Sequence, residues 1–154
     1  MTASKTDNAK GVLVDSLNSL LADHFALYVK TKNFHWHVRG PRFRDLHLQF
    51  DEQAQQILSV TDAIAERVRK NDADTLTSIG AIGKATRLKD EDSTSLDADG
   101  MIEQLKDDNG TLVVRLKQVK DASEEAGDNA TSGVVDEWTD LAEERVWFLR
   151  QALR

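Results

Sequence analysis

Apolar side chains recur every three or four residues along most of this chain, which is the pattern of amphipathic helices with one buried face. The first such stretch runs from about residue 8 to residue 38. It ends at Gly40-Pro41, because glycine terminates helices and proline cannot continue one. The second runs over residues 43–70 and contains neither glycine nor proline, so it predicts one continuous helix.

Two further helical stretches follow a long connection over roughly residues 71–94, which includes a short helical stretch at 76–83. The third long helix is expected to start near residues 95–97, where Ser or Asp can cap the first turn, and to stop at Gly127. The Thr-Ser pair at 131–132 is expected to cap a fourth helix that runs to near the C-terminus.

The lengths of the connections predict how these helices pack. Short links make the first and second helices, and the third and fourth, antiparallel neighbours. The long crossover can bring the third helix back along the bundle, as in ferritin-like folds. The expected fold is therefore all-α: a ferritin-like four-helix bundle with a short extra helix in the crossover between helices 2 and 3. Residues 1–10 are expected to be a mobile N-terminal tail, and residues 11–154 the bundle domain.

Composition agrees with long helices and removes several classes of protein. The chain has one proline, eight glycines, 40% hydrophobic and 31% charged residues. It has no cysteine, which excludes disulfides, thiolate metal sites and cysteine nucleophiles. No apolar run approaches the ~18–20 residues of a membrane span, and the first ten residues lack the apolar core of a signal peptide. A cytoplasmic location without a membrane partner is expected.

The net charge of −7 favours cations as partners and opposes nucleic acid. Any DNA contact must come from a local basic segment. In the expected tail the candidates are Lys5 and Lys10, which Asp7 offsets. Direct DNA binding is therefore expected to be weak.

Five side chains that commonly bind metals fall within 32 residues: His35, His47, Asp51, Asp62 and Glu66. The first helical pair is His47 with Asp51 and the second is Asp62 with Glu66; each pair is four residues apart and shares a helix face. On one straight helix the centres of the two pairs lie about 22 Å apart, whereas metal–ligand bonds are only about 2 Å long. If all five bind one metal centre, its two halves must come from different chains.

An antiparallel pairing of two such helices about residues 56–57 would place each His/Asp pair opposite a partner's Asp/Glu pair. Imidazole and carboxylate without sulfur suit iron, zinc or manganese, bound as one ion or as two with bridging oxygens. The Glu-x-x-His motif of an intrachain ferritin centre does not occur in this chain. His37 is expected on the opposite helix face from His35, and His24 is expected to be buried and hydrogen-bonded.

The motif His-Trp-His-Val-Arg-Gly at 35–40, with His47 and Asp51 after it, resembles the signature of the Dps family, the DNA-binding proteins from starved cells or mini-ferritins. The stretch Asp-Ala-Ile-Ala-Glu-Arg at 62–67 resembles the second signature of that family. The resemblance implies a hollow homo-dodecamer with tetrahedral symmetry, built from two-fold dimers. It also implies a ferroxidase that oxidises Fe(II), preferentially with hydrogen peroxide, stores ferric mineral and so protects DNA.

The same resemblance assigns roles to residues. A mono-iron or di-iron centre at the dimer interface would be held by His35, His47 and Asp51 of one subunit and by Asp62 and Glu66 of its partner. Trp36 would lie beside this centre, and we expect it to be a core aromatic side chain rather than an electron donor.

The family has pores through which iron enters at its three-fold axes, lined by acids near the start of the last helix. The candidates here are Asp128, Asp136, Glu137 and Asp140. Gly133 stands where the family often has a pore aspartate, so a solvated acidic face is the alternative interpretation.

Two other functions are compatible with these observations. The chain could be a nucleoid-associated protein that compacts DNA and has incidental iron chemistry. It could also be a structural helical oligomer whose metal site is vestigial or filled by zinc.

Overall fold

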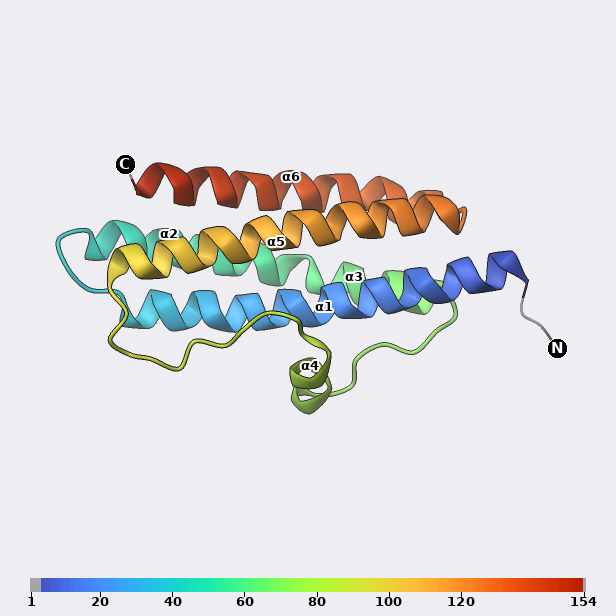
Figure 1. The fold of residues 1–154 in the computed structure, drawn as a ribbon, viewed down its shortest axis with the longest axis horizontal. Coiled ribbons are helices and arrows are strands. Elements are labelled where there is room, and N and C mark those ends of the chain that lie inside the picture. The colour runs from blue at the N-terminus through green and yellow to red at the C-terminus, as the bar shows by residue number, and fades with distance from the viewer. Residues whose placement is uncertain (1–3, 154) are drawn as a thin grey trace.

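The structure is a computed structural model that describes residues 4–153. Four long helical rods lie side by side, and a short helix sits on the outside of the first rod, away from the last two (Figure 1). The predicted ferritin-like four-helix bundle with an extra helix in the crossover is confirmed. In chain order the helices are α1 (Lys5–His37), α2 (Phe43–Ser59), α3 (Thr61–Lys70), α4 (Ile79–Ala85), α5 (Ala98–Glu125) and α6 (Asn129–Ala152).

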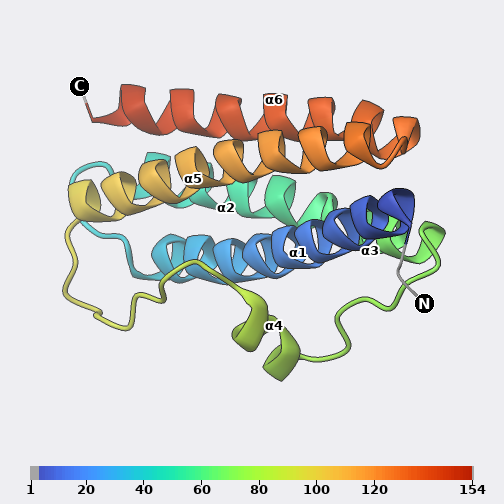
Figure 2. The same ribbon diagram turned by 45° about the vertical axis from the view of Figure 1, so that its right-hand side comes forward.

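The core is built from the apolar face of each rod, as the hydrophobic pattern predicts. The helices α5 and α6 pack along each other, and α1 packs against α2, α3, α4 and α5 (Figure 2). Side chains with no exposed surface come from every rod: Leu13, Leu20, Phe34, Phe50, Ile57, Ile64, Leu105, Leu112 and Leu149. Within residues 4–153, no helix combines the length and the apolar character needed to cross a bilayer.

The second rod is not the continuous helix that the sequence predicts, because it breaks at Val60 between α2 and α3. The hydroxyls of Ser59 and Thr61 each donate to a carbonyl oxygen three residues earlier, at 2.7 Å in both cases. These bonds compete with the helical backbone pattern and bend helices. Glycine and proline are therefore not the only residues that interrupt a helix, and the prediction of one straight helix over residues 43–70 is wrong.

The helix starts are set by capping side chains. Ser4 accepts from the backbone of Asp7 at 3.1 Å and Asp7 accepts from the backbone of Ser4, so α1 starts at Lys5. Residues 5–10, expected in a tail, therefore form the first turns of α1, while residues 1–3 lie outside the described residues. Asp97 caps α5 as predicted. Asp128 caps α6, so the predicted cap at 131–132 is wrong by one turn.

A buried carboxylate holds the long crossover against the bundle. Asp23 of α1 has no exposed surface. It accepts hydrogen bonds from Arg87 Nη2 at 2.6 Å, from Arg115 Nη1 at 3.0 Å and from the hydroxyl of Thr86 at 3.0 Å. These bonds join α1, α5 and the chain that follows α4. Two arginines compensate a charge that burial would otherwise make costly, which positions α4 on the outer side of α1.

Candidate metal centre

His35, in the last turn of α1, and His47, in α2, face each other across the first interhelical link. Their rings stack with centroids 3.8 Å apart and planes 15° apart. The Nδ1 of His35 lies 2.6 Å from the carbonyl oxygen of His47, and the Nδ1 of His47 lies 2.7 Å from the carbonyl oxygen of His35. Because a carbonyl oxygen only accepts, each Nδ1 carries its proton. In the neutral rings both Nε2 atoms are then left with a lone pair, the form in which histidine binds metals.

Asp51 lies one turn after His47 on α2. Its Oδ1 accepts a hydrogen bond from Lys32 Nζ of α1 at 2.8 Å. That bond and the positive charge of Lys32 hold the pKa of Asp51 below its usual value, so the carboxylate is ionised at neutral pH. We call His35, His47, Asp51 and Lys32 the histidine half-site. A metal ion that binds there must compete with the Lys32 ammonium for Asp51.

Exposed aromatic rings border the histidine half-site. Trp36 is 62% exposed in the single chain, so the expectation of a core aromatic is wrong. The Lys32 ammonium lies 5.9 Å from the centre of its ring. Phe43 is 44% exposed and stacks on His47 with centroids 5.0 Å apart. The predicted site residues did not include Lys32 and Phe43. Their spacings, three residues before His35 and four before His47, nevertheless place each on the same helix face as its histidine.

Asp62 and Glu66 lie on α3, beyond the break at Val60, and both are exposed. We call them the acidic half-site. Asp62 also borders a pocket of about 330 Å³ between α1, α3 and α4. Within residues 4–153 of one chain, no three His, Asp or Glu side chains come close enough to hold a metal ion together. One chain therefore holds no complete metal site: His35, His47 and Asp51 do not converge, and Asp62 and Glu66 lie on α3.

The other two histidines do not join either half-site. His24 is 1% exposed and its Nδ1 contacts the carbonyl oxygen of Leu20 at 2.8 Å, which confirms the predicted buried, hydrogen-bonded histidine. Burial lowers the pKa of His24 to about 4, so this ring is neutral at physiological pH. His37 is exposed and its Nδ1 lies 2.9 Å from the carbonyl oxygen of Asn33.

Two of the four candidate pore acids are already paired. Asp128 accepts from Arg67 Nη2 at 2.9 Å, from Asn71 Nδ2 at 2.9 Å and from the backbone of Thr131 at 3.0 Å. Burial alone would raise the pKa of Asp128, but these hydrogen bonds together hold it far below its usual value. A carboxylate with so many donors is a structural cap, which argues against Asp128 as a pore residue. Asp136 is bonded to Lys120 Nζ at 3.0 Å and remains largely exposed.

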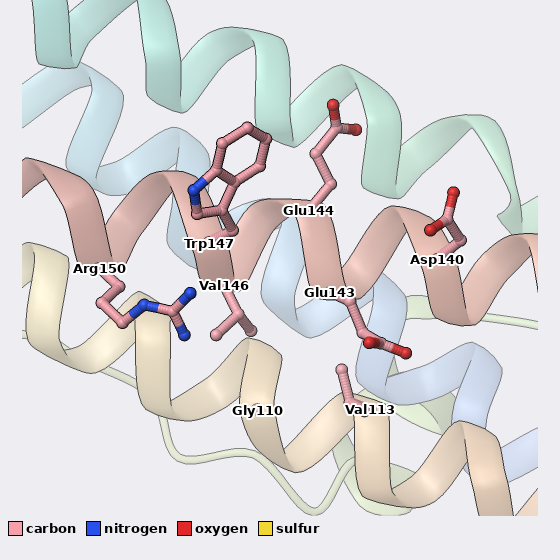
Figure 3. A pocket seen from close by; sticks show the side chains of 8 residues that line it. All are labelled: Gly110, Val113, Asp140, Glu143, Glu144, Val146, Trp147 and Arg150. Carbon is pink, nitrogen blue, oxygen red and sulfur yellow. The ribbon is translucent and has the colours of Figure 1, made fainter.

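Glu137 and Asp140 are exposed on α6. Asp140 lines a broad surface pocket of about 650 Å³ between α5 and α6 (Figure 3). Glu143, Glu144, Trp147 and Arg150 also line it. None of the five predicted metal ligands lines this pocket. Lys5 and Lys10, the candidate DNA contacts, are exposed on the first turns of α1.

Comparison with known proteins identifies the class of protein. Residues 14–154 match the family model described as a ferritin-like domain. The DNA protection during starvation protein of Brevibacillus brevis is 33% identical over 137 residues, which cover 89% of this chain and 91% of that protein. The chain belongs to the ferritin-like family and, within it, to the Dps family.

Solved structures agree with this assignment. Dps from Thermosynechococcus elongatus superimposes with a TM-score of 0.94 at 26% identity, covering 98% of this chain and 96% of the other. Dps from Vibrio cholerae O1 does so with a TM-score of 0.89 at 27% identity, covering 96% and 92%. The Vibrio protein is described as a member of a broad superfamily of ferritin-like diiron-carboxylate proteins.

Proposed function

We propose that this protein is an iron-oxidising and iron-storing mini-ferritin, in which two chains build each ferroxidase centre. His35, His47 and Asp51 of one chain would bind Fe(II) together with Asp62 and Glu66 of a second chain. Membership of a superfamily that includes diiron-carboxylate proteins supports iron as the substrate. Imidazole nitrogen and carboxylate oxygen are ligands that suit it.

The observation that carries the proposal is the complementarity of the two half-sites. The histidine half-site has two aligned imidazoles, one carboxylate and an ammonium, whereas the acidic half-site has two exposed carboxylates. The pair His47–Glu66 and the pair Asp51–Asp62 are both centred between residues 56 and 57. An antiparallel two-fold contact at that point therefore brings each histidine half-site onto a partner's acidic half-site. The break at Val60 adjusts the direction of α3 but leaves the order of the ligands along the rod unchanged.

The chain's own residues would perform two tasks in the reaction. The carbonyl contacts at Nδ1 keep both imidazoles oriented with Nε2 available for iron. Asp51, Asp62 and Glu66 supply negative charge that offsets the increase in iron charge on oxidation. Hydrogen peroxide takes one electron from each of two Fe(II) ions and, with two protons, leaves as two water molecules. Removing both reagents together prevents the one-electron reaction that releases hydroxyl radical.

The physiological role that follows is protection of DNA from oxidative damage by a cytoplasmic homo-dodecameric shell that stores ferric mineral. The Brevibacillus brevis relative is named for DNA protection during starvation. Twelve chains of net charge −7 carry roughly −84, which opposes contact with phosphate. Protection would therefore act through iron and peroxide rather than through a DNA complex.

Complementation between two defective variants tests the shared centre. Asp51→Ala and Glu66→Ala each remove a ligand from a different half-site, so each variant alone should oxidise Fe(II) slowly after anaerobic loading and addition of peroxide. In shells assembled from both variants, each mixed dimer has one centre that carries both defects and one intact centre. With random pairing about one quarter of all centres are intact, so fast oxidation should partly return.

His37→Ala is the control, because His37 is an exposed histidine of α1 about 200° around the helix from His35. Fast oxidation is expected in this variant. If the mixed shells stay as slow as the single variants while remaining assembled, the centre is not shared between chains.

Nucleoid compaction is the alternative function, and the exposed Lys5 and Lys10 favour it. A gel-shift series in increasing salt separates the two. Compaction requires retardation of DNA that declines steeply with added salt, whereas the proposed function requires none.

A further inference from the structure

The interior of the bundle contains a buried cation without a counter-charge. Arg145 of α6 is 2% exposed. Its Nε donates to Asn109 Oδ1 of α5 and its Nη1 donates to Gln56 Oε1 of α2, both at 2.7 Å, and both acceptors are neutral amides. Lys30, which is also buried, pairs with Asp108 Oδ2 at 2.7 Å. Arg145, in contrast, forms no salt bridge within residues 4–153.

This guanidinium is charged at neutral pH, although it is buried. Burial lowers the pKa of Arg145 to about 10, which is still well above neutrality. A buried charge that contacts only neutral groups is costly, and folded proteins normally place an opposite charge beside it. Glu144, the preceding residue, is exposed and accepts a hydrogen bond from Gln56 Nε2 at 3.3 Å. It therefore does not supply the missing charge at contact distance.

A small pocket between α2 and α6 is bordered by this arginine. Its volume is about 100 Å³. Two glutamines in its lining have buried polar atoms without a hydrogen-bond partner among the described residues: Oε1 of Gln53 and Nε2 of Gln49. Gln53 is 6% exposed, and its Nε2 donates to the carbonyl oxygen of Arg145 at the long distance of 3.4 Å. Because the last torsion of a glutamine side chain is broad, a small rotation turns these amides toward the pocket.

We infer that this pocket binds a small planar anion of single charge that carries one O–H group, of which hydrogencarbonate is the common example. Asn109 and Gln56 occupy one N–H group each of the guanidinium, and a guanidinium has five. The edge formed by Nη1 and Nη2 can therefore bind two oxygens of a planar anion through parallel hydrogen bonds. The O–H of the anion donates to Gln53 Oε1, and Gln49 Nε2 donates to the anion. The negative charge compensates Arg145, and none of this depends on the proposed iron chemistry.

The other lining residues and the unpaired acceptor restrict which anion fits. Glu52 and Glu144 are exposed carboxylates at the pocket, and their repulsion disfavours a doubly charged anion such as the phosphate dianion. Nitrate has the planar shape and the charge of hydrogencarbonate but no O–H, so it leaves Gln53 Oε1 without a partner. A buried acceptor left unpaired weakens binding by about tenfold.

Equilibrium binding to the assembled protein without iron tests the inference. Hydrogencarbonate labelled with ¹³C is titrated at mildly alkaline pH, where it is the main dissolved form of carbonate. Broadening of its ¹³C resonance by the large protein reports binding, and competition by nitrate at equal ionic strength gives the affinity for nitrate. We expect hydrogencarbonate to bind about tenfold more tightly than nitrate.

Variants assign the binding to this pocket. Gln53→Met keeps the size of the side chain and removes the acceptor, so the preference for hydrogencarbonate over nitrate should disappear. Arg145→Met should abolish binding of both anions. Arg150→Met removes an exposed arginine from the same helix and is the matched control, with unchanged binding expected.

Three results would overturn the inference. Equal affinities of the natural chain for hydrogencarbonate and nitrate would show that the O–H group is not recognised. Broadening that persists in Arg145→Met would place the anion elsewhere on the protein. No broadening with the natural chain would mean that water rather than an anion satisfies the polar atoms of the pocket.

Discussion

Lys32 is predicted to weaken metal binding, and replacing it should strengthen binding. Its ammonium lies 2.8 Å from Asp51 Oδ1. A divalent ion bound to the same carboxylate oxygen, at about 2 Å, would lie about 5 Å from that ammonium. With the dielectric constant of water, the repulsion between charges of +2 and +1 at this distance is about 1.7 kcal/mol. The side chains of Lys32 and Asp51 are 17% and 40% exposed, so this solvent-screened value is a lower limit.

We therefore expect Lys32→Met, which keeps the length of the side chain, to bind divalent metal at least about fifteenfold more tightly. The change does not act through protonation. Without Lys32 the pKa of Asp51 rises back toward its ordinary value of 3.8, and the carboxylate stays ionised at pH 7. The gain should shrink as salt screens the repulsion.

Anaerobic titration with Co(II) measures this effect, because its visible absorption reports the ligand set as well as the affinity. Lys10→Met removes the same charge from an exposed position on the same helix and serves as the control, with unchanged affinity expected. If Lys32→Met binds Co(II) no more tightly than the natural chain, or more weakly, then the ammonium is not a competitor for the carboxylate.

Three further predictions concern the ligands and the buried charges. The double variant His47→Ala/Asp51→Ala should lose fast peroxide-dependent oxidation yet remain assembled by light scattering; a normal rate in intact shells would remove both residues from the site. Asp128→Ala should lower the free energy of unfolding by about 3 kcal/mol, since it leaves Arg67 partly buried and unpaired and removes the cap of α6. Because the pKa of Asp128 is lowered in the fold, its ionised carboxylate stabilises the protein above pH 3.8, and this stabilisation declines as the pH falls below that value. The urea-unfolding midpoint of Asp128→Asn should therefore change less with pH in that range than the midpoint of the natural chain. The pKa of His24 is about 4 in the folded chain against 6.5 in the unfolded chain, so the free energy of unfolding should fall by up to about 3 kcal/mol between pH 6.5 and 4. A His24→Leu variant that shows the same fall would contradict the role of His24 in it.

The hydrophobic pattern predicted the four rods because burial of one helix face is encoded locally. It placed the crossover helix about two or three residues too early and missed the break at Val60. Both errors come from hydrogen bonds that a pattern of apolar residues does not report. Ser78 accepts from the backbone of Ala81 and so starts α4 at Ile79, and the hydroxyls of Ser59 and Thr61 bond to their own helix at the break. The misplaced cap of α6 has the same kind of cause, because Asp128 bonds Arg67 from another rod.

The candidate site was predictable in its ligand types and spacing but not in its surroundings. Four-residue spacing on a helix places His47 with Asp51, and Asp62 with Glu66, whatever the tertiary structure. The facing of the two histidine rings, the Lys32 contact and the exposure of Trp36 depend on how α1 lies against α2.

By itself, then, the order of residues determined the class of fold, the family and the separation of five ligands into two groups, because helical rise and periodicity are properties of the local backbone. Tertiary packing alone decided which nitrogen of each histidine is available, which acids are already paired and which aromatic ring remains uncovered. Those properties depend on contacts between residues far apart in the chain, and no local pattern contains them.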